Sequence, residues 1–399
     1  MEIIENGGIL SPAGFRAGAA RAGIKVAEEL DVALLVSDEP AVAAGVFTTN
    51  KFAAAPVQWD RQILPCSDLR AVVVNSGNAN ACTGSRGLAD ARTSARAVAD
   101  MVACRPEQVC VCSTGVIGHP LPMERLLKGI KAAHADLSSD SGAADRASRA
   151  IMTTDTRPKT SAVRGEIGGS AFTVGGMAKG AGMIAPNMAT MLGFVATDAG
   201  VAPDVLQSIV REVADETFNR ITIDGDTSTN DTVVVMANGA AGADACATPA
   251  GLGALRTALH TVMADLAVQI VSDGEGATRL VQIKVSGAAD DGDAHRVARA
   301  VAESLLFKCA VYGGDPNWGR IVCALGYADG RVTPERTTIH IGDTCVLEQG
   351  EPTHRDAAAG MSSSPVVVRV DLGLGTGGAT VWTCDMTHEY VTINADYHT

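Results

Sequence analysis

Short apolar runs rich in Val, Ile, Leu and Ala alternate along the chain with longer stretches in which apolar positions recur every three or four residues. The first pattern is typical of buried strands and the second of amphipathic helices. Strands are predicted at residues 32–36, 71–74, 109–111, 232–236, 281–285 and 366–370, and helices at 87–104, 122–134, 204–218, 251–271 and 294–309. Residues 341–364, rich in Gly, Ser, Pro and charge, are predicted to form a surface loop. This mixture of elements predicts an α/β fold with layered sheets.

The composition is that of a globular protein, and 399 residues suffice for two ordinary domains or one large one. Hydrophobic residues make up 46% of the chain and charged residues 19%, which argues against a disordered or membrane-embedded protein. The net charge of -13 would repel a polyanion, so we expect no nucleic-acid partner. The acidic N-terminus does not resemble a secretory signal, and no apolar stretch is long enough to cross a membrane. We therefore expect a cytoplasmic protein.

The cysteines and histidines give no sign of a metal site or a disulfide framework. The ten Cys are scattered without a C-x-x-C motif, and the eight His contain no H-x-x-x-H motif. Cys110 and Cys112 lie two residues apart in an apolar run, so they should share one face of a strand. Cys323 also follows an apolar run, and we predict buried, reduced thiols of a cytosolic protein. No metal and no cofactor is expected.

Two motifs resemble known ligand-binding loops but lack part of the required pattern. Residues 373–378 match G-x-G-x-x-G, but residues 379–384 that follow are typical of a strand, whereas a dinucleotide site needs a helix there. A Gly-rich hairpin or bulge is predicted instead. Residues 224–228 begin like a calcium loop, but Thr229 stands where the loop needs Gly and no Glu closes it. A polar turn at a strand end is predicted there.

The segment with the most unusual composition is residues 175–192, which holds Lys179, Asn187 and Thr190 among Gly and apolar residues. The residues alone leave three interpretations open: a close-packed turn into a buried strand, a loop that cradles phosphate, or a self-cleavage junction between Ala189 and Thr190. In the third, the hydroxyl attacks the preceding carbonyl and water opens the resulting ester. The freed Thr carries an α-amine of unperturbed pKa about 8, which can act as general base for its own hydroxyl.

This segment, together with eight further motifs in order, resembles the ornithine acetyltransferase family, also called bifunctional glutamate N-acetyltransferase or ArgJ. The resemblance covers essentially the whole chain and is weakest near residues 341–364. The further motifs lie at residues 14–17, 75–81, 113–118, 152–156, 224–231, 272–276, 315–320 and 393–399.

The resemblance implies a layered αββα sandwich of the type found in N-terminal-nucleophile hydrolases. It also implies cleavage into an α chain, residues 1–189, and a β chain, residues 190–399, that pair further into a heterotetramer. Thr190 would take the acetyl group from N-acetylornithine and pass it to glutamate in a double displacement. No cofactor is implied, although some family members also use acetyl-CoA as a donor.

Further site residues follow from the same resemblance. The Thr114 hydroxyl and the Gly115 N–H would stabilise the oxyanion of the tetrahedral intermediate. Substrate-binding positions carried over from the family are Thr156, Lys179, Thr190, Glu275, Asn394 and Thr399. By charge matching, we assign Lys179 to a substrate carboxylate and Glu275 to a substrate ammonium group. The apolar run before Asn394 indicates that the C-terminal tail is held in place.

Two other functions remain as alternatives. One is a self-cleaving amidase or aminopeptidase, in which water rather than glutamate meets the acyl-enzyme. The other is an amino-acid-binding protein that neither cuts itself nor catalyses a reaction. The motifs outside the nucleophile segment resemble the transferases and favour acetyl transfer. The proportion of acetyl transfer to acetate release would separate the first alternative, and a single uncut chain without turnover would indicate the second.

Overall fold

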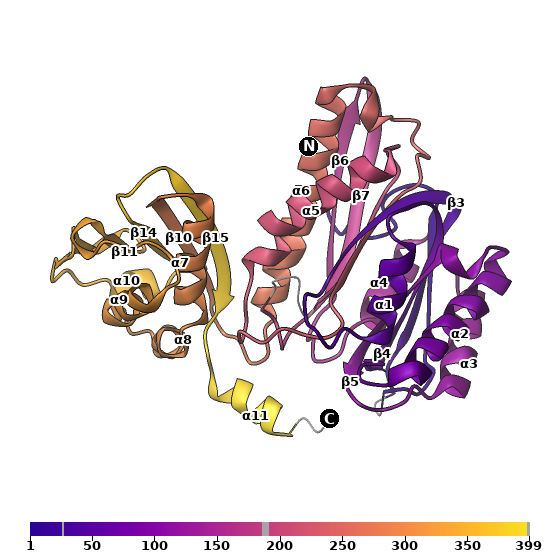
Figure 1. The fold of residues 1–399 in the computed structure, drawn as a ribbon, viewed down its shortest axis with the longest axis horizontal. Helices are drawn as coiled ribbons and strands as arrows, with labels where there is room; N and C mark the ends of the chain where they lie inside the picture. The colour runs from indigo at the N-terminus through magenta and orange to yellow at the C-terminus, as the bar shows by residue number, and fades with distance from the viewer. Residues whose placement is uncertain (26–27, 186–190, 397–399) are drawn as a thin grey trace. The chain divides into compact units, whose positions relative to one another are not determined.

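The computed structural model describes residues 1–25, 28–185 and 191–396. It divides into two compact units. The first is built from residues 1–219 and 226–270, and the second from residues 220–225 and 271–398. Each unit has its own sheet and its own helices (Figure 1).

Within the described residues, the first unit contains a nine-stranded mixed sheet in the order β1-β6-β7-β8-β9-β3-β4-β5, with β2 paired to β3. Four of its strands contain or match the apolar runs predicted from the sequence. The strands are β1 (Glu2–Ile3), β2 (Phe15–Ala20), β3 (Val32–Phe47), β4 (Cys66–Asn78), β5 (Val109–Val116), β6 (Lys159–Ile167), β7 (Ser170–Lys179), β8 (Leu192–Thr197) and β9 (Thr232–Ala237).

This sheet folds over on itself at β3. The first part of β3 pairs with β2 and β4, whereas residues 42–47 pair with β9, and the register against β4 shifts between Val36 and Ala43. Inward side chains of the β2–β5 half and of the β7–β9 half therefore meet in one buried core. That core includes Leu35, Val72, Val74, Cys110, Cys112, Met177, Phe194, Val234 and Met236.

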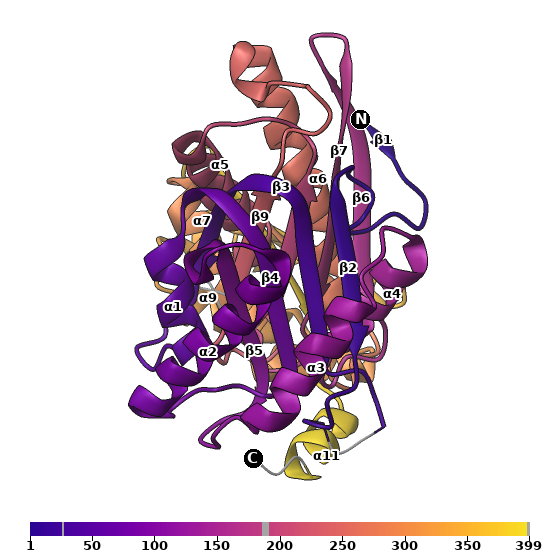
Figure 2. The same ribbon diagram turned by 90° about the vertical axis from the view of Figure 1, so that its right-hand side faces the viewer.

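Helices cover the outer faces of both halves. The helices of this unit are α1 (Ala55–Ile63), α2 (Gly84–Val102), α3 (Met123–Ala135), α4 (Ser141–Ala150), α5 (Pro203–Glu216) and α6 (Pro249–Ser272), the last of which ends in the second unit. Figure 2 shows α2 and α3 over the strands β3–β5, where Val98 and Ile130 join the core on that side. On the other half, Val262 and Leu266 of α6 lie against Gly176 of β7. The layers confirm the predicted αββα sandwich.

The second unit is built on a six-stranded sheet in the order β13-β12-β11-β14-β10-β15. Helices α7 and α9 pack on it and bury an apolar core that includes Val297, Val301 and Ile321. Its strands are β10 (Leu280–Ala288), β11 (Thr338–Ile341), β12 (Thr344–Glu348), β13 (Glu351–Pro352), β14 (Val366–Asp371) and β15 (Gly377–Cys384). Its helices are α7 (Asp291–Glu303), α8 (Leu305–Gly313), α9 (Trp318–Tyr327), α10 (Ala358–Met361) and α11 (His388–Asp396).

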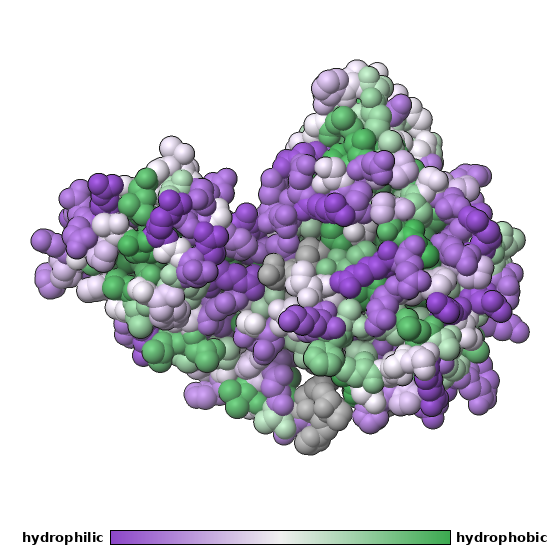
Figure 3. All heavy atoms as spheres, viewed as in Figure 1, coloured by the Kyte–Doolittle hydropathy of each residue, from purple (hydrophilic) through white to green (hydrophobic). Residues whose placement is uncertain are grey.

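The outer side of α8 is apolar. Leu305 and Leu306 are about three-fifths exposed and Tyr312 is 39% exposed, and Figure 3 shows apolar side chains gathered over this helix. Two cysteines of these helices, Cys309 in α8 and Cys323 in α9, are exposed as well. The prediction of buried thiols is therefore wrong for these two. It is confirmed for Cys110 and Cys112. An exposed apolar helix face is typical of a surface that contacts another protein chain.

Two sequence predictions need correction in the second unit. The helix predicted at 294–309 is two helices, because Ser304 adopts extended backbone and its Oγ accepts the Phe307 N–H as the N-cap of α8. Residues 341–364 are not a single loop, since β12, β13 and α10 lie within them.

The Gly-rich segment 373–378 leads into strand β15 as expected. Of the two forms predicted for it, a hairpin is excluded, because β14 and β15 flank β10 on opposite sides. The register between β10 and β15 shifts where Gly377 pairs with Ala288, which agrees with a bulge.

Candidate active site

Polar side chains gather at one edge of the first unit's sheet. Lys179 ends β7, and the register pairs it with Leu192, the first residue of β8. Leu192 is paired in turn with Thr232, the first residue of β9. Asn230, just before β9, donates to the Ser113 carbonyl oxygen at 2.8 Å and so joins this edge to β5. Residues distant in the sequence thus meet where these strands begin or end.

The end of strand β5 carries two of the predicted residues, Thr114 and Gly115, both half-buried. Its position is fixed by Ser113, whose hydroxyl donates to Asn75 Oδ1 at 2.6 Å. Gly115 has φ +130°, and a Cβ there would lie 2.3 Å from the carbonyl carbon of Gly77. Only glycine fits this left-handed, close-packed position. The end of β5 therefore holds the Thr114 side chain in a defined place.

Lys179 is almost completely buried, with 4% of its surface exposed. Its ammonium group donates to Thr153 Oγ1 at 2.9 Å and to Thr114 Oγ1 at 3.3 Å. The structure thus brings together two residues that the sequence placed in one site. Thr153 belongs to a motif that the sequence comparison singled out, but it was not predicted as a site residue.

A buried ion pair lies behind Lys179. The side chains of Asp155 and Lys159 are fully buried, and Asp155 Oδ1 accepts from Lys159 Nζ at 2.5 Å and from the Gly180 N–H at 2.7 Å. Burial alone would raise the pKa of Asp155, but the charges of Lys179 and Lys159 lower it to about 2. Asp155 is therefore ionised at neutral pH. Its only sequence signal was its place in the motif at residues 152–156.

Asp231 is a second buried carboxyl group at this edge, directly before β9. Within the described part of the chain, neither carboxylate oxygen has a hydrogen-bond partner of good geometry. Burial raises its pKa well above the ordinary value, and the nearby Met191 N–H, Thr48 hydroxyl and Lys179 ammonium only partly oppose this. Asp231 thus keeps its proton to higher pH than an ordinary carboxyl group. Sequence reasoning gave it no role.

Three further predicted residues, Thr156, Ala189 and Thr190, belong to the first unit. Thr156 is exposed and follows Asp155 in the loop before β6. Ala189 and Thr190, the predicted cleavage junction, lie outside the described residues. The first described residue after them, Met191, accepts a backbone hydrogen bond from Thr232 at 3.1 Å.

The second unit brings together another predicted pair. Asn394 of α11 donates through its side-chain amide to Glu275 Oε2 at 2.7 Å, and Glu275 follows the end of α6. Tyr390 of the same helix donates to Asp224 Oδ2 at 3.2 Å. These contacts agree with the prediction that the tail before Asn394 is held in place and that residues 224–228 form a polar turn. Thr399 lies outside the described residues.

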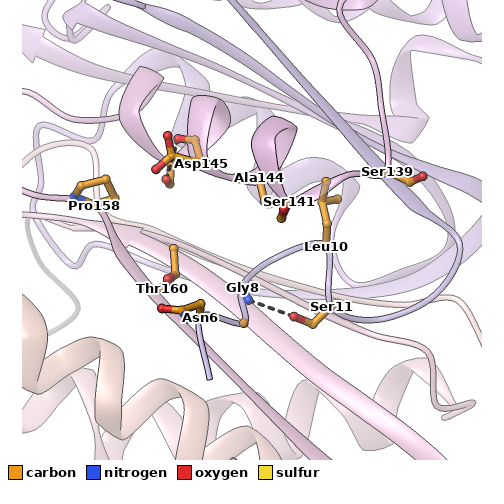
Figure 4. Close-up of a pocket in the computed structure, with 12 residues that line it drawn as sticks. Asn6, Gly8, Leu10, Ser11, Ser139, Ser141, Ala144, Asp145, Pro158 and Thr160 are labelled. Atoms are coloured by element: carbon orange, nitrogen blue, oxygen red, sulfur yellow. Dashed lines mark hydrogen bonds between the residues drawn. The ribbon is translucent and has the colours of Figure 1, made fainter. Parts of the chain in front are cut away.

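A pocket of about 500 Å³ lies elsewhere in the first unit, between the segment 6–11, the start of α4 and β6 (Figure 4). Its lining is mostly hydroxyl groups and backbone, with Ser11 Oγ accepting from the Gly8 N–H at 2.9 Å. Its one lining carboxylate, Asp145, pairs with Arg149 at 2.8 Å. None of the predicted site residues is among the residues that line this pocket. The pocket is therefore separate from the polar edge that holds Thr114 and Lys179.

In the described part of the chain, no three His, Cys, Asp or Glu residues are grouped so that they could hold a metal ion. No helix there is both long and apolar enough to cross a membrane.

The αββα sandwich with its polar edge defines an α/β protein of the layered type. A family model described as the ArgJ family matches residues 16–399. The chain is 51% identical to the arginine biosynthesis bifunctional protein ArgJ of Symbiobacterium thermophilum, over 98% of this chain and 99% of that protein. It is 50% identical to the protein of the same name from Geobacter sulfurreducens, over 97% and 99%.

A solved structure gives the same indication. The arginine biosynthesis bifunctional protein argJ of Bacillus halodurans is 46% identical with a TM-score of 0.50, and the match covers 52% of this chain and all of that one. The chain belongs to the ArgJ family.

Proposed function

We propose that this protein is a glutamate N-acetyltransferase of arginine biosynthesis that moves the acetyl group of N-acetylornithine to glutamate. Family membership over nearly the whole chain carries the proposal. The polar edge supports it, because Thr114 and Lys179 meet there beside the start of β8, two residues after Thr190. Thr190 is the proposed nucleophile, freed by cleavage of the Ala189–Thr190 bond.

The proposed chains, residues 1–189 and 190–399, would stay together after cleavage without any linker. The cut falls between β7 and β8, which are neighbouring antiparallel strands with six paired positions from Val174↔Thr197 to Lys179↔Leu192. A new chain end at this place keeps the sheet intact, because ladder hydrogen bonds and the shared core bind the two strands. The boundary between the two structural units lies elsewhere, near residues 219 and 271.

In the reaction, the Thr190 hydroxyl attacks the acetyl carbonyl, its α-amine takes the proton, and ornithine leaves with that proton. Glutamate then attacks the acyl-enzyme and restores the free hydroxyl. Thr114 and Gly115 are the proposed oxyanion donors. Thr156, Lys179, Glu275, Asn394 and Thr399 are the proposed substrate-binding residues. The Glu275 carboxylate is a suitable partner for a substrate ammonium group.

Two further properties belong to the proposal. Acetyl-CoA is a second acetyl donor, as the resemblance implies for some family members. The cleaved chains assemble into a heterotetramer, which is supported by the exposed apolar face of α8 with Leu305 and Leu306. The site uses no metal and no cofactor in this scheme, since the chemistry needs only a hydroxyl, an amine and oxyanion donors. The protein acts in the cytoplasm.

The test is the intact mass of the denatured wild-type protein beside the Thr190→Ala and Thr190→Ser variants. We expect the 40.8 kDa chain to be replaced by fragments 1–189 and 190–399 in the wild type, and to persist in Thr190→Ala. Thr190→Ser keeps a hydroxyl and should still be cut. A wild-type chain that remains whole yet transfers acetyl groups would contradict the α-amine as base.

The acceptor separates the proposal from an amidase. N-acetylornithine labelled in its acetyl group is supplied with and without glutamate, and N-acetylglutamate and acetate are measured. Transfer should exceed acetate release by at least about tenfold when glutamate is present. Acetate as the main product would mean a hydrolase, and an uncut, inactive wild type would mean a binding protein. Acetyl-CoA as sole donor tests the second activity in the same assay.

A further inference from the structure

Asn230 is a buried side chain of the motif at residues 224–231, and neither the proposed cleavage nor the proposed acetyl transfer uses it. It lies two residues before β9, with 7% of its surface exposed. Its amide nitrogen is 2.6 Å from the Ala79 carbonyl oxygen and 2.8 Å from the Ser113 carbonyl oxygen. Carbonyl oxygens can only accept, so the group that faces them is the NH2. Asn230 Oδ1 in turn accepts from the Thr229 hydroxyl at 2.5 Å.

These two hydrogen bonds hold both ends of the proposed oxyanion pair, residues 114–115. The Ser113 carbonyl group comes directly before the pair, and Asn230 donates to it. Directly after the pair, the Val116 carbonyl oxygen accepts the Ala79 N–H at 2.9 Å. Asn230 also donates to the carbonyl group of Ala79. One amide group therefore restrains the chain before the oxyanion pair directly and the chain after it through Ala79.

The backbone ladder alone does not provide this restraint. The parallel pairing of β4 with β5 runs regularly from Ala71↔Val109 to Gly77↔Gly115 and becomes irregular at Asn78. Buried carbonyl groups at the end of a ladder need other hydrogen-bond donors. Asn230 supplies these donors from the other half of the folded sheet, where β8 and β9 pair in parallel.

The proposed cleavage gives this contact a further meaning. Asn230 belongs to the proposed chain 190–399, which begins with the nucleophile, whereas Ala79 and Ser113 belong to the chain 1–189, which carries the oxyanion pair. Asn230 comes two residues before Thr232, and Thr232 pairs with Leu192 at the start of β8. Oxyanion donors act only when they are held at the correct place, and a displacement of about 1 Å can cost about 100-fold in rate.

We propose that Asn230 is a positioning residue for oxyanion stabilisation: its amide group holds both ends of the oxyanion pair and keeps Thr114 and Gly115 in place relative to β8 and β9. The proposal rests on the proposed acyl-transfer function. Asn230 contacts no reacting atom and transfers no proton. Its effect on the reaction passes through the backbone of residues 113–116.

The experiment compares Asn230→Leu with Gln207→Met. Gln207 of α5 is also 7% exposed, and its side-chain amide makes two hydrogen bonds with the Gly45 backbone at 3.0 and 3.2 Å. Each variant keeps the side-chain size and deletes two buried hydrogen bonds to backbone, so both should lower the free energy of unfolding by similar amounts. The kinetic measurement is kcat and KM for acetyl transfer per cleaved chain, with cleavage followed by intact mass.

Only the Asn230 variant should slow the reaction. Asn230→Leu should lower kcat about tenfold or more, with KM changed less than about threefold. Gln207→Met should change kcat less than about twofold. Asn230→Asp keeps the shape of the side chain, but a carboxylate has no donor, so kcat should fall as far as in Asn230→Leu.

A double-mutant cycle with Thr114→Val tests whether Asn230 acts through the oxyanion pair. Thr114→Val should lower kcat about 100-fold, as the loss of one oxyanion donor does elsewhere. In that background, the loss caused by Asn230→Leu should be at least about threefold smaller than in the wild type.

Amide hydrogen exchange gives a measurement that needs neither cleavage nor turnover. It is made on the uncut Thr190→Ala protein with and without Asn230→Leu. Exchange at residues 113–118 should become about tenfold faster in the variant, because the two hydrogen bonds that restrain this segment are gone. Exchange at residues 109–112 of the same strand should stay unchanged, which a misfolded protein would not show.

Several results would overturn the proposal. An equal loss of kcat in Gln207→Met would mean that any buried amide of this unit affects the rate through stability. A raised KM with unchanged kcat in Asn230→Leu would mean a role in substrate binding. Full additivity with Thr114→Val, a fully active Asn230→Asp variant, or unchanged exchange at residues 113–118 would exclude action through the oxyanion pair. A wild type without acetyl transfer would instead contradict the proposed function, while the exchange result would still report on the positioning.

Discussion

Asp155 and Asp231 are two buried aspartates at the same edge of one sheet, yet their surroundings shift their pKa values in opposite directions. Asp155, in the loop before β6, accepts from Lys159 Nζ at the start of β6 at 2.5 Å and from the Gly180 N–H after β7 at 2.7 Å. Asp231, directly before β9, has no hydrogen-bond donor in good geometry among the described residues. The pKa of Asp155 is lowered to about 2, whereas burial raises that of Asp231 well above the usual value.

The difference teaches that burial alone does not decide the charge of a carboxyl group. Desolvation raises the pKa in both cases, and the outcome depends on whether cations and N–H donors lie within hydrogen-bond reach. Lys179 lies near both groups, but only Asp155 also has Lys159 beside it. The Asp155 region therefore holds fixed charges next to Thr114, while the carboxyl group of Asp231 keeps its proton to higher pH than that of Asp155.

Removing the Asp155 carboxylate should have the largest effect. Asp155→Asn leaves Lys159, whose side chain is fully buried, without its carboxylate partner, and an uncompensated buried charge costs about 3–5 kcal/mol. The measurement is the free energy of unfolding in urea, made in the Thr190→Ala background so that one uncut chain unfolds.

Asp145→Asn is the matched control, because Asp145 also pairs with a basic residue four positions along the chain but is 54% exposed. It should change the free energy of unfolding by less than about 0.5 kcal/mol. If the two variants lose similar amounts, the burial of the Asp155–Lys159 pair has no energetic consequence.

Acid should abolish the contribution of Asp155. A carboxyl group whose pKa is lower in the folded than in the unfolded chain stabilises the fold above the unfolded pKa, here 3.8, and this stabilisation is lost as pH falls towards about 2. The shift corresponds to about 2 kcal/mol. The free-energy difference between the parent and Asp155→Asn should therefore shrink between pH 5 and pH 2. A difference that stays constant over this range would mean that Asp155 is not ionised in the folded protein.

Much of the fold could be predicted from the sequence, because strand and helix periodicities are local. The runs at 32–36, 71–74 and 109–111 all lie within strands. The β6–β7 hairpin was missed although its signal was present: Gly168 and Gly169, both with positive φ, form a two-residue turn between strands. The break at Ser304 was also readable in principle, since Ser is a favourable N-cap. Short strands such as β12 lie below what periodicity can detect.

The site was harder to predict, because its energetics depend on three-dimensional neighbours. The family resemblance named Thr114 and Lys179 in one site, and the structure brings them within 3.3 Å. Burial of Lys179, the Asp155–Lys159 pair and the isolated Asp231 have no local sequence pattern. A lysine after a strand and before Gly180 is equally typical of a solvated loop. Charge matching assigned Lys179 to a substrate carboxylate and gave no sign that its ammonium group also donates to two of the protein's own hydroxyls.

The smallest expected effect is a gain in stability from removing the Asp231 carboxyl group. A carboxyl group whose pKa is raised by folding destabilises the folded state above the unfolded pKa, 3.8, because the unfolded chain releases the proton more easily. Asp231→Asn should therefore raise the free energy of unfolding at pH 7, and the gain should disappear as the pH falls to the unfolded pKa of 3.8. Asp198→Asn is the control, since Asp198 accepts the N–H groups of Thr173 and Ala13 at 2.6 and 3.0 Å. It should lose stability at neutral pH, because those hydrogen bonds to a charged acceptor are weakened. If Asp231→Asn instead loses stability at neutral pH and the loss shrinks as the pH falls, Asp231 is ionised and paired in the folded protein, and the contrast with Asp155 does not exist.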